Sequence, residues 1–148
     1  MSIQPSHLGQ VVCSRCGAGN RIAAGHPPEA ARCGKCGASL FAGVPIEVDD
    51  AAFERHLKLT QGLILVDVWA PWCGPCRVMG PHFAEVAHDL AGRAAFLKLN
   101  SDENATPAKL GVRGIPTLIL FKDGREIDRR TGLMTAQALR AWVQSASG

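Results

Sequence analysis

The chain has 148 residues, a formal net charge of +3 at pH 7 and 47% hydrophobic residues. This length has room for one ordinary domain plus a small appendage, and this composition excludes an intrinsically disordered chain. The apolar runs fall far short of the roughly 20 residues that span a bilayer, so no membrane association is expected. Residues 1–5 do not combine a charged region with an apolar one. We therefore expect no secretory signal and a cytoplasmic location.

Two Cys-x-x-Cys pairs, Cys13/Cys16 and Cys33/Cys36, lie in the N-terminal segment between Val11 and Phe41. Structural disulfides are rare in a reducing cytosol, where such pairs more often bind a metal or carry out redox chemistry. Their spacing fits one tetrahedral Cys₄ site, which predicts one structural zinc ion per chain in a small zinc-ribbon-like module. Without metal, a segment this short would bury too little apolar surface to fold. Two structural disulfides, or reactive thiols without metal, are the alternatives.

The surplus of positive charge is confined to this N-terminal segment. Its charged residues are Arg15, Arg21, Arg32 and Lys35 against Glu29, whereas basic and acidic residues balance from Ile46 onward. Four thiolates and one Zn²⁺ would contribute a net negative charge, so the basic residues are interpreted as compensation for the metal site. A nucleic-acid-binding segment would interleave aromatic residues with basic ones, so no nucleic-acid partner is expected.

The remainder of the chain alternates predicted strands with predicted helices. The strands are expected at residues 46–48, 63–69, 94–99, 116–121 and 125–130. Helices are expected after a cap at Asp49 or Asp50, from residue 77 to about 91, over 102–110, and after a cap at Thr135. Asp123-Gly124 predicts a hairpin between the last two strands. This order predicts an α/β fold with a mixed sheet covered by helices on both faces. Residues 42–45 form a short connector, which divides the chain into modules 1–43 and 44–148.

A third pair, Cys73 and Cys76, lies where the apolar strand 63–69 gives way to a helix. Unpaired backbone N–H groups and the positive end of the helix dipole stabilise an anion at such a position. The pKa of Cys73 should therefore fall below the free-cysteine value of about 8.5. The two intervening residues allow Cys76 to close a disulfide with it. Cys73 is interpreted as the attacking thiol and Cys76 as the resolving one.

The stretch Trp69-Ala70-Pro71-Trp72-Cys73-Gly74-Pro75-Cys76 closely resembles the active site of the thioredoxin family. The resemblance extends over about a hundred residues and implies the thioredoxin fold. Together with the N-terminal cysteines, it is closest to the zinc-containing thioredoxins of bacteria. Asp67 matches the buried acid of the family, Lys98 its lysine partner, and Gly114 to Thr117 its cis-proline loop.

The resemblance implies a protein-disulfide reductase that acts on cytosolic target proteins through a Cys73/Cys76 dithiol cycle. Asp67 would take the proton from Cys76, and Lys98 would modulate its charge. A solvent-facing aspartate at the strand end and a solvated lysine are the alternatives. The implied partners are disulfide-containing proteins and an NADPH-dependent thioredoxin reductase, and a monomer is expected. The implied substrate-binding rim comprises Trp72, Gly74, Pro75, Ile115, cis-Pro116 and Gly132.

Two rival functions remain at this stage. One is a disulfide oxidant, which the reductant-like Gly74-Pro75 pair and the lack of a steady cytosolic oxidant disfavour. The other is a binding protein in which the zinc module recruits partners and the second module is a scaffold. The five histidines offer no competing chemistry and are expected to be surface or boundary residues.

Overall fold

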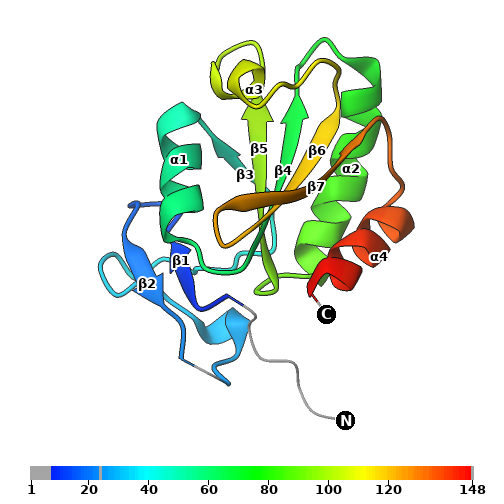
Figure 1. The fold of residues 1–148 in the computed structure, drawn as a ribbon. Helices are drawn as coiled ribbons and strands as arrows, with labels where there is room; N and C mark the ends of the chain where they lie inside the picture. Colours follow the sequence, from blue (N-terminus) through cyan, green and yellow to red (C-terminus); the bar gives the residue numbers. More distant parts are fainter. Residues whose placement is uncertain (1–7, 24, 148) are drawn as a thin grey trace.

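The computed structural model describes residues 8–23 and 25–147, and its centre is a mixed sheet of five strands. β3 and β4 each run parallel to β5, β6 runs antiparallel to β4, and β7 runs antiparallel to β6. The predicted α/β fold with a mixed sheet is confirmed (Figure 1). In spatial order the strands are β3 (Ile46–Val48), β5 (Ala94–Asn100), β4 (Leu63–Trp69), β6 (Thr117–Lys122) and β7 (Arg125–Thr131).

Helices cover both faces of this sheet, as predicted (Figure 1). The helices are α1 (Asp50–Leu59), α2 (Gly74–Asp89), α3 (Thr106–Lys109) and α4 (Ala136–Ser147). One face packs against α2 and α4 through a cluster that includes Met79, Phe83 and Leu139. The opposite face packs against α1, whose Phe53 meets Phe121 edge to face with ring centroids 5.7 Å apart. The strongly apolar central strands follow from this two-sided burial.

Strand β4 is the most completely buried element of the sheet. Every residue from Leu63 to Val68 is buried, and only Trp69 is partly exposed. Side chains alternate between faces along a strand, and Leu63 and Leu65 pack on the side of α2. Asp67 lies two residues beyond Leu65, so its side chain also faces α2, the helix that carries Cys76.

One local prediction differs from the structure. Residues 102–110 were expected to form one helix, but only Thr106–Lys109 is helical. The side chain of Asn100 accepts from the N–H of Asp102 at 2.9 Å, and Asn104 donates to the carbonyl of Asn100 at 3.0 Å. Such side-chain bonds to the local backbone compete with helix formation.

The N-terminal segment forms its own two-stranded antiparallel sheet, β1 (Gln10–Val12) with β2 (Gly19–Arg21), followed by a 3₁₀ turn at Pro28–Ala30. It joins the larger sheet at Gln61, whose N–H donates to the carbonyl of Gln10 at 2.9 Å. Because Gln61 precedes β4 and Cys73 follows it, the segment and the Cys73–Cys76 pair lie at opposite ends of the sheet (Figure 1).

A cavity of about 50 Å³ lies between this segment and the larger sheet, lined by Val11, His56 and Thr60 among others. His56 is only 5% exposed, so the expectation that all five histidines are surface or boundary residues is wrong for this one. Docking of the N-terminal segment on α1 accounts for the difference. Burial lowers the pKa of His56 to about 4.

Within residues 8–23 and 25–147, every helix is too short or too polar to cross a bilayer.

Asp49 caps α1, since its Oδ1 accepts from the N–H of Ala52 at 2.8 Å. We expect Asp49→Ala to lower the free energy of unfolding by about 1 kcal/mol, because the alanine leaves that N–H without its acceptor. Asp49→Asn retains an acceptor and serves as the control. Urea unfolding of the three proteins checks the prediction, and equal losses in both variants would contradict it.

Candidate active site and cysteine cluster

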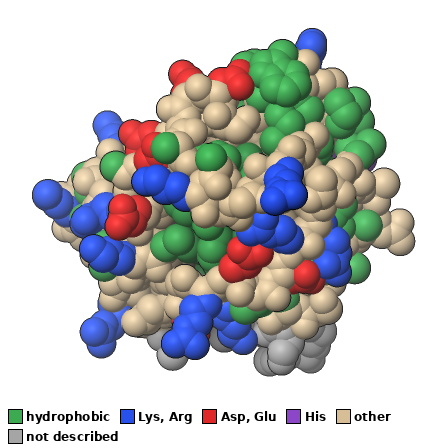
Figure 2. Space-filling view, turned by 45° about the horizontal axis from the view of Figure 1, so that its top comes forward, with side chains coloured by type: hydrophobic (Ala, Val, Ile, Leu, Met, Phe, Trp, Pro, Cys, Tyr) green, Lys and Arg blue, Asp and Glu red, His purple; other side chains and the backbone are tan. Residues whose placement is uncertain are grey.

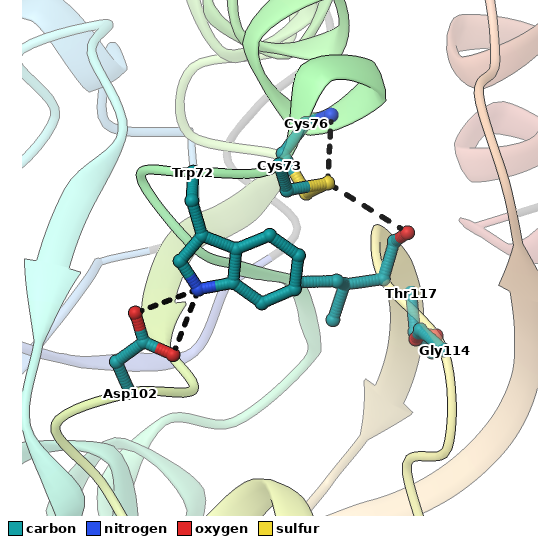
Figure 3. The surroundings of a disulfide bond; sticks show 7 residues. Trp72, Cys73, Cys76, Asp102, Gly114 and Thr117 are labelled. Carbon is teal, nitrogen blue, oxygen red and sulfur yellow. Dashed lines mark hydrogen bonds between the residues drawn. A yellow bond between two sulfur atoms is a disulfide. The ribbon is translucent and has the colours of Figure 1, made fainter.

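Cys73 and Cys76 are joined by a disulfide at the beginning of α2. Cys73 is the N-cap residue, and its Sγ accepts from the backbone N–H of Cys76 at 3.2 Å (Figure 3). Gly74 and Pro75 occupy the first helical positions, where the missing N–H of proline costs no helical hydrogen bond. A sulfur anion on Cys73 would therefore be stabilised by a helix N-terminus, as the sequence predicted.

The two cysteines differ in their access to the surface. Both are only 4% exposed. Cys73 nevertheless lines a surface groove of about 600 Å³, together with Trp72, Gly74, Pro75 and Ile115, whereas Cys76 is not among the lining residues. Figure 2 shows the molecule with the end of the sheet where α2 begins turned toward the reader, and hydrophobic side chains gather on this surface. This geometry favours Cys73 as the sulfur that meets an incoming molecule.

Trp72 projects its indole at this surface and is 69% exposed. Its Nε1 donates to both carboxylate oxygens of Asp102, at 3.1 and 2.9 Å (Figure 3). This contact fixes the indole while leaving the ring available to solvent. Sequence reasoning missed Asp102, although a carboxylate just after the strand that neighbours β4 was a usable signal.

The loop before β6 faces the disulfide from the neighbouring strand. The Ile115–Pro116 bond is cis, which confirms the prediction. The carbonyl oxygen of Ile115 lies 3.8 Å from Sγ of Cys73. Gly132, with a φ of 102°, donates its N–H to the carbonyl of Pro116 at 2.8 Å. Thr117 donates through Oγ1 to the carbonyl of Gly114 in the same loop (Figure 3). Four of the predicted rim residues line the groove beside Cys73, and the other two, Pro116 and Gly132, are hydrogen-bonded to each other next to Ile115.

Asp67 is completely buried, which excludes the solvent-facing alternative. Neither of its carboxylate oxygens has a hydrogen-bond partner among the described residues. Burial raises the pKa of Asp67 to about 7, while Lys98 lowers it and Glu47 raises it further. The raised pKa expected from the sequence is confirmed in direction.

Lys98 lies directly opposite Asp67 in the register of β4 with β5. Its side chain is half-buried, and Nζ sits 4.3 Å from the centroid of the Trp69 ring. Within the described part of the chain, Lys98 makes no salt bridge. The lysine is therefore beside the acid, as predicted, but its ammonium contacts an aromatic ring.

The four N-terminal cysteines converge although they come from two separate turns. Their Sγ atoms all lie within 4.8 Å of one another, with 3.6 Å between Cys13 and Cys36 and 3.5 Å between Cys16 and Cys33. The two turns have matching hydrogen bonds. Gly17 donates to the carbonyl of Cys13 at 2.8 Å, and Gly37 to that of Cys33 at 2.9 Å. Both glycines have φ values near 78°, the left-handed region that glycine adopts most readily.

This donor set fits a metal ion. Tetrahedral zinc with Zn–S bonds of about 2.3 Å separates its sulfurs by roughly 3.8 Å, close to the spacing found here. The N–H of Lys35 and the side-chain amide of Asn20 point to Sγ of Cys33, at 3.4 and 3.5 Å. Backbone donors, first that of Cys36, lower the pKa of Cys33 to about 6. None of the four cysteines is in a disulfide in this structure. The geometry therefore does not support the alternative of two structural disulfides.

Comparisons with known proteins agree with this geometry. A family model described as thioredoxin matches residues 44–145. Thioredoxin from Pseudomonas aeruginosa is 46% identical over 101 residues, covering 68% of this chain and 94% of its own length. Thioredoxin C-3 from Corynebacterium nephridii is 36% identical over 138 residues, covering 90% of this chain and 92% of its own. That match is too long to be confined to residues 44–148.

A solved structure agrees as well. A point mutant of thioredoxin from Halobacterium salinarum NRC-1 superimposes with a TM-score of 0.66 at 32% identity, covering 72% of this chain and 93% of that one. The fold, the disulfide at the start of α2 and the relatives together identify a protein-disulfide reductase. The chain belongs to the thioredoxin family.

Proposed function

We propose that this chain reduces disulfides in cytosolic target proteins through a dithiol cycle of Cys73 and Cys76. The observation that carries the proposal is the disulfide at the N-terminus of α2, of which Cys73 alone lines the surface groove. The four further cysteines converge as potential metal ligands and form no disulfide, which suits a reducing compartment.

The cycle begins when the thiolate of Cys73 attacks one sulfur of a target disulfide. A Cys73–target disulfide forms, and the first target sulfur leaves as a thiolate and is protonated. Cys76 then loses its proton and attacks Sγ of Cys73, which expels the second target sulfur. The target gains two electrons, and the protein retains the Cys73–Cys76 disulfide. A thioredoxin reductase drawing on NADPH would return the two electrons.

Asp67 is the proposed acceptor for the proton of Cys76. It faces α2 from β4, and its pKa of about 7 makes it a stronger base than an ordinary aspartate. Lys98 is the proposed modulator of this acid, since it lies opposite Asp67 and its positive charge favours the ionised carboxylate.

The rim of the groove is proposed to bind an extended segment of the target. The backbone of Ile115 would pair with the segment as an added strand does. Trp72 supplies an exposed apolar surface whose orientation Asp102 holds. Gly74, Pro75, Pro116 and Gly132 complete a surface with few projecting side chains near the sulfurs.

Cys13, Cys16, Cys33 and Cys36 are proposed to hold one zinc ion per chain, within a module of residues 1–43. Their mutual Sγ distances support the assignment. When bound, zinc would supply a structural cross-link between two turns that share little apolar core.

Substitution of the two active-site cysteines should separate the two steps of the cycle. We expect Cys73→Ser to abolish reduction of insulin disulfides, because it removes the attacking sulfur. Cys76→Ser should accumulate mixed disulfides with targets, because the second step cannot occur. Turbidity of insulin with dithiothreitol and non-reducing electrophoresis measure these outcomes. Full insulin reduction by Cys73→Ser would sink the proposed cycle.

Asp67→Asn should remove a pH dependence of stability. The folded pKa of Asp67, about 7, exceeds the unfolded value, so the charged form opposes folding. Stability therefore declines as pH rises from the unfolded pKa to the folded one, by about 4 kcal/mol in total. Urea unfolding of the oxidised proteins should show that the free energy of unfolding of Asp67→Asn increases relative to that of the parent protein as pH rises across this window. A constant difference from acid to alkaline pH would refute the assignment.

Metal analysis of the purified chain should find about one zinc ion per chain. Cys33→Ser should lose most of this zinc, because a hydroxyl is a poor replacement for a thiolate ligand. Ser39→Ala in the same segment is the control and should retain it. Zinc-loaded protein that fails to reduce insulin would favour the rival function, a binding protein built on this fold.

A further inference from the structure

Three charged side chains form one row on the side of the sheet that faces α2. Lys98 of β5 pairs with Glu47 of β3 on one side and with Asp67 of β4 on the other. Directly paired residues of neighbouring strands project from the same face of a sheet. The lysine is therefore placed between two carboxylates, one of which is buried and the other exposed.

Trp69 connects the members of this row. It follows Asp67 by two residues and so projects from the same face of β4. Its indole Nε1 donates to Oε2 of Glu47 at 3.1 Å, and the face of its ring lies 4.3 Å from Nζ of Lys98. The indole of Trp69 therefore contacts Lys98 with its face and Glu47 with its N–H. The ammonium of Lys98 is attracted to the face of the aromatic ring.

We propose that Glu47 is a positioning residue for proton transfer at Asp67: its carboxylate holds Trp69 over Lys98 and shares the charge of the ammonium, which prevents a close ion pair between Lys98 and Asp67. This inference deepens the proposed function and rests on the assigned role of Asp67. Glu47 was not among the candidate residues of the sequence.

The surroundings of Asp67 leave few other charges to do this. Its partner on β6 is Leu118, which is apolar. Arg130 of β7 lies beyond Leu118 and is 5.0 Å from the ring of Trp142. From α2, the thiol of Cys76 in the reduced protein is the titratable group that shares this side of the sheet. Glu47 is accordingly the negative charge that raises the pKa of Asp67, after burial.

The arrangement matters for catalysis because a general base is most useful when its pKa lies near the working pH. A close ion pair with a lysine would lower the pKa of an aspartate by one to three units. Asp67 would then remain ionised but accept the proton of Cys76 poorly. By keeping Lys98 on the indole, Glu47 preserves the basicity of Asp67.

Two variants separate the charge of Glu47 from its hydrogen bond. Glu47→Gln keeps an acceptor for the indole of Trp69 but has no charge, whereas Glu47→Ala loses both. The titration of the Asp67 carboxyl, followed by ¹³C NMR of the oxidised protein, should have a lower midpoint in each variant. We expect a decrease of roughly half a pH unit for Glu47→Gln, discounted for the exposure of this side chain, and a larger one for Glu47→Ala. The inflection of insulin reduction against pH should fall by the same amounts.

Glu54→Gln is the matched control, because Glu54 is exposed on α1 and this substitution changes the net charge by the same amount as Glu47→Gln. Its midpoint should equal that of the parent protein. The inference is overturned if either Glu47 variant leaves the Asp67 midpoint unmoved, or if Glu54→Gln moves it equally. A carboxyl midpoint that falls while the inflection of activity stays would instead support the placement of Lys98 by Glu47 and refute Asp67 as the proton acceptor.

Discussion

The burial of β4 is the constraint on which the active site depends. Strands on both edges and helices on both faces bury β4 almost completely, and the residues that follow it begin α2. That point carries Cys73 as the helix cap. The same burial denies Asp67 any solvent and thereby raises its pKa. One strand therefore determines both where the sulfurs lie and how basic the neighbouring acid is.

The two cysteine chemistries are kept apart by the direction of this strand. The N-terminal segment joins the sheet next to Gln61, before β4 begins, and the disulfide follows its end. Strand β4, with its seven residues, lies between these two points and spans about 23 Å. At this distance the four N-terminal thiols cannot exchange directly with Cys73. The four-cysteine cluster and the Cys73–Cys76 disulfide are thus separate sites within one chain.

The sequence was informative wherever a pattern is local. The five strands of the larger sheet, a helix cap at Asp49 or Asp50, the Asp123-Gly124 hairpin and the disulfide at a helix start could all be predicted from short stretches. The place of Glu47 beside Lys98 could not, because it depends on β5 lying between β3 and β4. His56 was misjudged for a similar reason, since a distant segment covers it. Contacts between segments that are distant in the sequence leave no pattern in the neighbouring residues, whereas helices and strands do.

The outer strand β7 has a consequence for how the sheet behaves when it meets another chain. Its side chains are mostly charged, with ion pairs between Glu126 and Arg129 and between Asp128 and Arg130, and its register with β6 is irregular near Phe121. Charges and irregularities at a sheet edge discourage pairing with another chain. Strand β7 therefore discourages the addition of a strand from another chain at this edge of the sheet.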